Sequence, residues 1–393
     1  MKRNLKENFS PLYFLSALGS GGLAISFFMY LQFMVPHKGV PMATFNHIMT
    51  TASQSPIWIQ FLIYAAMAGV IVFGVTHLRL LAWNLSEFKV FRQTLNYKNV
   101  LNSPQAISLM AVPLTLAMSI NVLIVSAVVF IPGLWDYVEY LFPVSLTLFT
   151  LVGIYALKIF GRYMIRVIIE GDQNFVNTNN LSNLLSIFAF SMIAVGFAAP
   201  AAMSHHLVVN AIGLGMSVLF LSLAGILSLV KFTLGFRSII EKGISQEGSP
   251  SLWIIIPFLT LAGITIIRLL MSLDHHFNDK VSNPTLLVLG SFILGLQIIN
   301  GIVGYFVMKQ NKYFDEFVGG KKQSAASFSL ICPGVAFFVF GMFFIHFGIL
   351  RNEIIDQFSI AYFLILIPFV FIQYRTISTF FKLNRKMLFV KMK

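Results

Sequence analysis

The chain alternates between long apolar runs and short polar connections. Each run holds about 20 residues or more, enough to cross roughly 30 Å of hydrocarbon as a helix that rises about 1.5 Å per residue. We therefore expect an all-helical polytopic membrane protein with one transmembrane domain, residues 1–393. The ten expected helices cover approximately residues 11–34, 56–78, 105–131, 137–161, 182–204, 207–231, 250–272, 284–308, 326–349 and 358–378.

Lysine and arginine are concentrated at the chain ends and in every second connection. These segments hold 23 of the 27 basic residues, and the other four are Lys38, Arg268, Lys280 and Arg351. Cytoplasmic loops of membrane proteins retain positive charge, so this alternation predicts a multi-pass protein of the cell (inner) membrane with both termini cytoplasmic. The even number of runs agrees with that orientation.

Connections on the expected outer side are short, for example residues 132–136 and 204–206. Short links make consecutive helices antiparallel neighbours, so the pattern predicts five helical hairpins. The odd-numbered helices carry small residues and prolines, and a proline inside a span frees a carbonyl that protein or a water-filled cavity has to satisfy. We expect these five helices to be kinked and to line a quasi-fivefold central path; the alternative is that small residues only allow close packing. The residues concerned are Gly19, Pro113, Gly196, Pro257, Pro333 and Gly334.

Composition excludes a soluble class, because 57% of the residues are hydrophobic and 10% are charged. The net charge of +13 follows from the positive cytoplasmic segments and suits anionic lipid headgroups. No basic stretch alternates with aromatic residues in the manner of a nucleic-acid groove, so we expect no nucleic-acid partner. The single cysteine excludes an intrachain disulfide and a cysteine-cluster metal site.

This architecture resembles the tellurite-resistance/dicarboxylate transporter (TDT) superfamily, which includes bacterial TehA channels and plant slow anion channels. The resemblance covers the whole chain through its ten spans, cytoplasmic ends and proline-containing odd helices. It implies a quasi-fivefold bundle with an anion path on its axis, a phenylalanine gate and a homo-oligomer, often a trimer. No family motif aligns residue by residue, so the resemblance does not identify the gate.

The stretch from Ser329 to Ala336 is also similar to the TsoY family, some members of which carry selenocysteine where this chain has Cys332. That similarity implies a link to sulfur-compound metabolism. At helical spacing Cys332 shares a face with Ala336, Phe340 and Phe343. Its thiol is either available to sulfur or selenium species beside the path or is a small buried hydrophobe.

Aromatic side chains of the ninth helix are the expected gate, because a ring in a narrow apolar constriction blocks ions by dewetting. Phe340 is the preferred residue since it shares the Cys332 face, and Phe337 is the second candidate. Each of these rings also fits ordinary helix packing.

Two polar residues inside the runs are expected to attract anions. Arg268 is the one Lys or Arg well inside a run, where ionisable residues are functional candidates. It would act at the outer mouth of the path, or else reach the interface or pair with Asp274 or Asp279. The amide of Asn121 would assist it, although helix–helix hydrogen bonding explains such residues as well.

Paired histidines lie at the expected outer ends of the third and fourth hairpins. Such a cluster would bind zinc or copper, or make a vestibule more positive at low pH. Adjacent histidines point in different directions on a helix, so we expect no metal site. The residues are His205, His206, His275 and His276.

No run carries an aspartate or glutamate at mid-depth, and the chain lacks Walker, Rossmann and HExxH motifs. We therefore expect no enzyme and no cofactor, but a channel or facilitative transporter for small anions. Inorganic monoanions, dicarboxylates and sulfur oxyanions all remain candidate substrates. The alternative is a membrane redox or sulfur- and selenium-handling protein that uses Cys332, and a third possibility is a membrane scaffold with a closed, packed axis.

Overall fold

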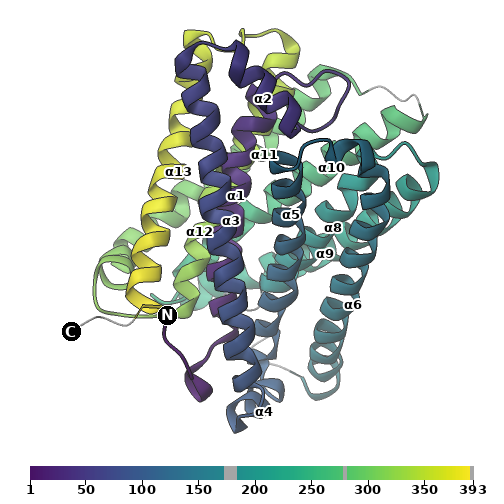
Figure 1. Ribbon diagram of the computed structural model, residues 1–393. Coiled ribbons are helices and arrows are strands. Elements are labelled where there is room, and N and C mark those ends of the chain that lie inside the picture. Colours follow the sequence, from purple (N-terminus) through teal and green to yellow (C-terminus); the bar gives the residue numbers. More distant parts are fainter. Residues whose placement is uncertain (172–183, 278–280, 390–393) are drawn as a thin grey trace.

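The computed structural model describes residues 1–171, 184–277 and 281–389, and all its regular elements are helical. Ten helices within these residues are long and apolar enough to cross a membrane, which confirms the prediction of an all-helical multi-pass membrane protein. The spanning helices are α1 (Phe14–Met34), α3 (Ile57–Phe91), α5 (Ala111–Phe130), α6 (Val138–Glu170), α8 (Leu185–Met203), α9 (Leu207–Lys242), α10 (Ile255–Phe277), α11 (Asn283–Gln310), α12 (Ile331–Phe343) with the π-helical turn η9 (Phe344–Ile349), and α13 (Ile360–Met387) (Figure 1).

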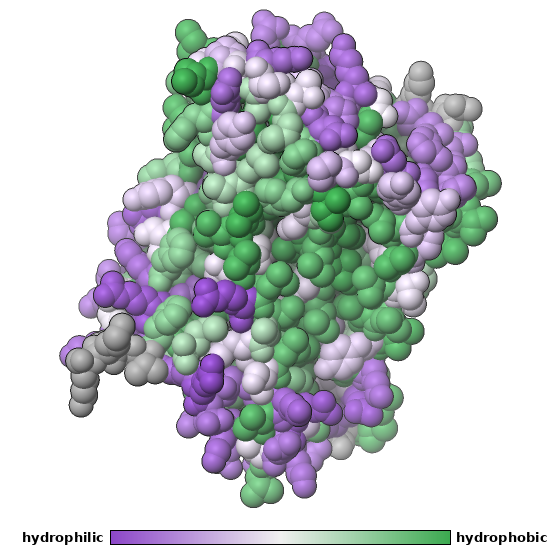
Figure 2. Space-filling model, viewed as in Figure 1, coloured by the Kyte–Doolittle hydropathy of each residue, from purple (hydrophilic) through white to green (hydrophobic). Residues whose placement is uncertain are grey.

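The surface carries a hydrophobic band between two hydrophilic ends (Figure 2). Large apolar side chains such as Ile226 on α9 and Phe292 on α11 are exposed. A soluble protein rarely exposes a continuous apolar surface of this extent, whereas lipid requires one. The band therefore matches the hydrocarbon layer that the ten helices are long enough to cross.

Five helices are much more buried than the other five. Between 50% and 89% of the most apolar window is buried in the spans of α1, α5, α8, α10 and α12, which we call the inner helices. The corresponding share is 22% to 39% in the outer helices α3, α6, α9, α11 and α13. The inner helices contact one another in the order α1, α5, α8, α10, α12 and back to α1, and each outer helix contacts the inner helix that precedes it.

Four inner helices begin with a short 3-10 turn on the side of the molecule that holds the chain termini. These turns are η2 (Pro11–Tyr13), η3 (Pro104–Met110), η6 (Ser249–Trp253) and η8 (Ala325–Leu330). Ser10, Ser103 and Ser324 cap three of them by accepting a backbone N–H two residues ahead. Serine is a favoured N-cap and proline a favoured first residue, so these starts are encoded locally.

Three of the prolines expected to kink the odd-numbered helices lie at the starts of those helices. Pro113, Pro257 and Pro333 each occupy the third position of an α-helix, directly after the 3-10 turn. These three prolines therefore lie near the starts of their helices and not at the middle of the spans.

The two chain ends lie on the same side of the molecule (Figure 1). The Lys2 amide donates to the Leu388 carbonyl at 2.7 Å, and the Trp83 indole donates to the Lys2 carbonyl at 2.7 Å. The buried Glu87 carboxylate accepts from the amides of Asn4 and Leu5. These contacts fix the N-terminal segment against α3 and α13, with α4 (Leu95–Leu101) at the same end and α2 (Phe45–Gln54) at the opposite end.

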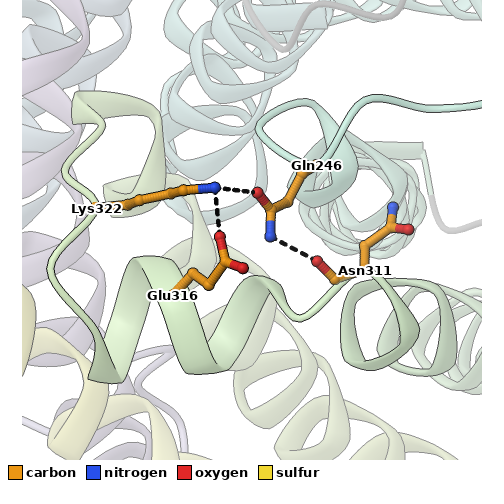
Figure 3. A network of polar contacts seen from close by, with 4 residues as sticks. All are labelled: Gln246, Asn311, Glu316 and Lys322. Atoms are coloured by element: carbon orange, nitrogen blue, oxygen red, sulfur yellow. Dashed lines mark hydrogen bonds and ion pairs between the residues drawn. The ribbon is translucent and has the colours of Figure 1, made fainter.

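A polar network joins the connections that precede α10 and α12 (Figure 3). Lys322 pairs with Glu316 and donates to the Gln246 side-chain oxygen at 2.8 Å. The Gln246 amide in turn donates to the Asn311 carbonyl at 2.7 Å. Hydrogen bonds from Lys322 and Gln246 lower the pKa of Glu316, so the network is held with its carboxylate ionised. It ties together the starts of two inner helices.

Candidate functional site

A cavity of about 140 Å³ lies among the five inner helices, and residues of all five line it. The loop after α1 adds one residue, Met42. Pockets between the helices of a bundle are a common place for binding sites. The lining includes Leu18, Gly19, Gly22, Ile25, Phe28 and Met29 of α1; Met118, Asn121 and Val125 of α5; Phe188, Met192 and Val195 of α8; Pro257, Thr260, Leu261, Ile264 and Arg268 of α10; and Cys332, Val335, Ala336, Val339 and Phe343 of α12.

The lining residues follow the same spacing on four helices. On each, a first residue is followed by a second four positions later and a third three positions after that. Such residues lie on one face of a helix, so each helix presents one continuous stripe to the cavity. The stripes are Leu18, Gly22 and Ile25; Phe188, Met192 and Val195; Pro257, Leu261 and Ile264; and Cys332, Ala336 and Val339.

Arg268 supplies the one charged side chain of the cavity lining. Its guanidinium donates to the Val195 carbonyl at 3.0 Å and forms no ion pair with the residues that the structure describes. A guanidinium has five N–H donors, so most of its donor capacity is not used by these protein groups. Within the described residues the structure therefore places a cation without a counter-charge on a cavity inside the helix bundle. Of the two expected partners, Asp274 forms no ion pair with Arg268, and Asp279 lies outside the described residues.

Asn121 of α5 also lines the cavity. Its side-chain amide donates to the Ala117 carbonyl at 3.3 Å and to the Met192 sulfur at 3.8 Å. A thioether is a weak acceptor, so one of these N–H groups is free to exchange it for a stronger one. Both residues expected to attract anions thus border the same cavity.

Thr260 is the third polar side chain of the lining, and its hydroxyl is already engaged. It donates to the Ala336 carbonyl at 3.0 Å and accepts from the Gln297 amide at 2.7 Å. These bonds connect α10, α12 and α11 and leave little capacity for a ligand. Apart from Arg268, Asn121 and Thr260, the cavity lining is therefore almost entirely apolar.

Two further cavities lie closer to the helix starts. A small one of about 10 Å³ shares Phe188, Pro257 and Cys332 with the central cavity, so these side chains lie between the two. A polar one of about 620 Å³ is bordered by the 3-10 turns and the links before them. Along η8 and α12 the three cavities follow one another, from Ser324 to Ala326, then Ser329 to Pro333, then Cys332 to Phe343.

The structure brings some of the predicted path residues to these cavities. Gly19, Asn121, Pro257, Arg268 and Cys332 line the central cavity, and Pro333 lines the small one. The face predicted for Cys332 is correct for Ala336 and Phe343, which share the cavity with it.

Other predicted residues do not line the central cavity. The Phe340 ring is fully buried against Gly263 of α10, and Phe337 stacks on Phe369 of α13 with ring centroids 4.9 Å apart. Pro113 is buried in the first turn of α5. Gly196 and Gly334 face Phe149 of α6 and Thr376 of α13, where a side chain would collide. At these two glycines close helix packing, the alternative explanation, accounts for the residue.

The sequence reasoning missed Phe188 and Met42. Phe188 begins the α8 stripe as Cys332 begins the α12 stripe, but only the cavity lining reveals which residues form these stripes. Met42 lies in a loop outside the apolar runs.

Histidines gather at the end of the molecule opposite the termini. The ring centroids of His205 and His275 are 4.9 Å apart, and those of His275 and His276 are 4.7 Å apart. His276 contacts the Ser204 carbonyl at 2.9 Å, while Glu139 accepts from Ser204 and from the His205 amide. Among the described residues no group of three or more His, Cys, Asp or Glu is placed to hold a metal ion.

Comparison with known proteins returned no match: no protein-family model, no curated protein and no solved structure is similar to this chain.

Proposed function

We propose that this protein is a channel or facilitative transporter for small anions. The observation that carries the proposal is Arg268, a cation that forms no ion pair with the described residues and lines a cavity that all five inner helices border. Charged residues inside membrane proteins face the bundle interior and mark ion or substrate pathways. An anion that enters the cavity would supply the missing counter-charge.

We further propose that the chain forms five helical hairpins around a quasi-fivefold path. The cyclic order of contacts among the inner helices and the repeated stripe spacing support this arrangement. The third residues of the four stripes, Ile25, Val195, Ile264 and Val339, all border the cavity. The same architecture is the one implied by the resemblance to the TDT superfamily, as is assembly into a trimer.

The path would run along the inner helices through the three cavities. It begins at the 620 Å³ cavity, which is bordered by the links and 3-10 turns that precede α1, α5, α10 and α12. Helix N-termini carry partial positive charge and unsatisfied amides, which favour anions. The basic connections share this side with the termini, so positive charge retained during insertion would make it the cytoplasmic entrance.

We place the constriction of this path at Phe188. Its side chain, with Pro257 and Cys332, borders both the central cavity and the 10 Å³ cavity. An aromatic ring in an apolar constriction blocks ions by excluding water. Phe188 therefore replaces Phe340 as the candidate gate residue, because the Phe340 ring packs against Gly263.

Anion flux in proteoliposomes tests the proposal, with chloride, nitrate, sulfite, thiosulfate and succinate as substrates. Phe188→Ala should raise flux above wild type because it opens the constriction. Phe340→Ala is the matched control, since it removes a buried ring that does not line the cavity. Absence of flux for every anion in both wild type and Phe188→Ala would overturn the proposal.

A second candidate function rests on Cys332, whose side chain borders both the central and the small cavity. In this case the thiol reacts with a sulfur or selenium compound that enters the path. The chain has one cysteine, so a partner molecule would have to supply the second thiol of any disulfide exchange. Cys332→Ser separates the two functions: anion flux persists in a channel, whereas thiol-dependent turnover stops.

A further inference from the structure

The central cavity is chemically different at its two ends. Pro257 and Arg268 both line it and are eleven residues apart on α10, which is about 16 Å along a helix. Arg268 gives one end N–H donors, Asn121 lies beside Met192 in the middle of the α8 stripe, and Phe188, Pro257 and Cys332 border the other end. A ligand that fills the cavity along its length would meet charge at one end and apolar surface along the rest.

The number of charges in the cavity limits the ligand to a single negative charge. Arg268 is the cation, and the Thr260 hydroxyl is already bonded to Ala336 and Gln297. A second anionic group would lie against Ile264, Leu261 and their neighbours without a hydrogen-bond donor. Burying an unpaired charge costs far more than a carboxylate gains from one guanidinium, so dicarboxylates and sulfate fit poorly.

The apolar wall also disfavours small inorganic anions. Chloride or nitrate at Arg268 would leave the rest of the cavity empty or filled with water that has no polar partner. Apolar cavities of about 150 Å³ remain dry and bind molecules of the size of benzene. The volume here is about 140 Å³, so an apolar group of about six carbons would occupy it.

We propose that the cavity is a binding site for a monocarboxylate with a short apolar tail. The carboxylate accepts from the Arg268 guanidinium, a geometry that suits a two-oxygen acceptor. The tail lies along Ile264 and Val339 toward Cys332. This inference rests on the proposed function because it uses the same cavity, and it narrows the substrate class.

Isothermal titration of the purified protein tests the site. The probes are the sodium salts of acetate, butyrate, hexanoate, octanoate and palmitate, with succinate and chloride for comparison. Affinity should rise by roughly fourfold for each added methylene up to about six carbons and then stop rising, because each buried methylene contributes a fixed transfer free energy. Palmitate binding that exceeds hexanoate binding would indicate a lipid acyl chain and overturn the size argument.

Two variants and a control locate the ligand. Arg268→Gln should weaken hexanoate binding by at least about tenfold, as expected for loss of a charged hydrogen bond. Arg237→Gln is the matched control, because Arg237 pairs with Glu241 on an exposed part of α9. Val339→Phe should shift the preferred chain to shorter acids since its ring takes up cavity volume. Equal chain-length preference in wild type and Val339→Phe would overturn the proposed tail position.

Flux measured beside binding separates this inference from the proposed function. Binding of hexanoate that depends on Arg268, without transport of any anion, would support the site and reject the channel. Flux of chloride or nitrate without chain-length-dependent binding would support the channel and reject the site.

Discussion

The inner and outer helices are alike in hydropathy but opposite in environment. The mean hydropathy of the most apolar window is 1.6 to 2.3 in the inner spans and 1.8 to 2.2 in the outer ones. Nevertheless, 89% of that window is buried in the α8 span and 22% in α11. Lipid and protein interior are both apolar, so hydropathy cannot distinguish the two environments.

Small residues of the inner helices allow close packing. Enlarging one of them should therefore have the largest effect on the stability of the fold. A Cβ atom at Gly196 of α8 would collide with the Phe149 ring of α6. We expect Gly196→Val to destabilise the fold by about 3 kcal/mol or more, because overpacking forces the helices apart. Thermal unfolding of the purified protein measures it.

Gly215→Val on α9 is the control, since nothing lies within 4 Å of the added Cβ there. It should leave the unfolding temperature near that of wild type. Equal destabilisation by both variants would mean that the effect of Gly196→Val comes from glycine flexibility and not from helix contact.

A charge placed on the exposed face of an outer helix tests whether that face contacts lipid. Ile226, near the middle of α9, is 62% exposed. Ile226 lies five residues before the end of the apolar run 207–231. Ile226→Arg should therefore disfavour membrane insertion by less than the roughly 2.5 to 3.5 kcal/mol that arginine costs at mid-depth. Insertion is measured as the fraction of protein recovered in the membrane.

Ile240→Arg, at an exposed position near the end of the same helix, should insert normally because its charge reaches the headgroups. Normal insertion of Ile226→Arg would show that the exposed face of α9 meets protein or water instead of lipid.

The hydrogen bonds of Thr260 link the two sets of helices. Thr260→Val keeps the shape but removes the acceptor for the Gln297 amide, which is buried between α10 and α11. A buried donor without a partner costs about 1 to 3 kcal/mol, so the unfolding temperature should fall.

Thr233→Val on exposed α9 removes a local bond to the Leu229 carbonyl and should change stability by less than about 0.5 kcal/mol. A Thr260→Val protein as stable as Thr233→Val would indicate that another group satisfies Gln297.

The smallest expected effect concerns the link that holds the starts of α10 and α12. Hydrogen bonds from Lys322 and Gln246 lower the pKa of Glu316 below its ordinary value of 4.5. Its contribution to stability is therefore complete above pH 4.5 and is lost as the pH falls through the lower folded-state pKa.

The unfolding temperature should consequently fall slightly more in wild type than in Glu316→Gln between pH 6 and pH 3. Parallel pH profiles would show that this exposed network does not contribute measurably, as is common for surface ion pairs.

The helix ends show where hydropathy stops being informative. The run predicted at residues 56–78 is the start of α3, which continues to Phe91 through Arg79 and Lys89. Hydropathy marks the segment inside the hydrocarbon, whereas a helix continues into water wherever its buried face still has contacts. Phe88 and Phe91 pack on Phe9 and therefore extend the helix.

The polar residues of the candidate site were predictable from the sequence, but its aromatic residue was not. Arg268 and Asn121 stand out because polar groups are rare in apolar runs, and both line the cavity. Phe340 and Phe188 look equivalent in the sequence, since both are phenylalanines in odd-numbered runs. Only the rotation of α12 and α8 about their axes directs Phe188 toward the cavity and Phe340 toward Gly263.

The sequence by itself determined the number of spanning helices, their order and the rare polar residues within them. Polar groups are costly in lipid, so a membrane-spanning segment is recognisable by its hydropathy. Only the tertiary structure decided which helices are buried and which side chains meet at the cavity. Those features depend on contacts between residues far apart in the chain, such as the contact of Arg268 with the Val195 carbonyl. Neither hydropathy nor helical period records such contacts.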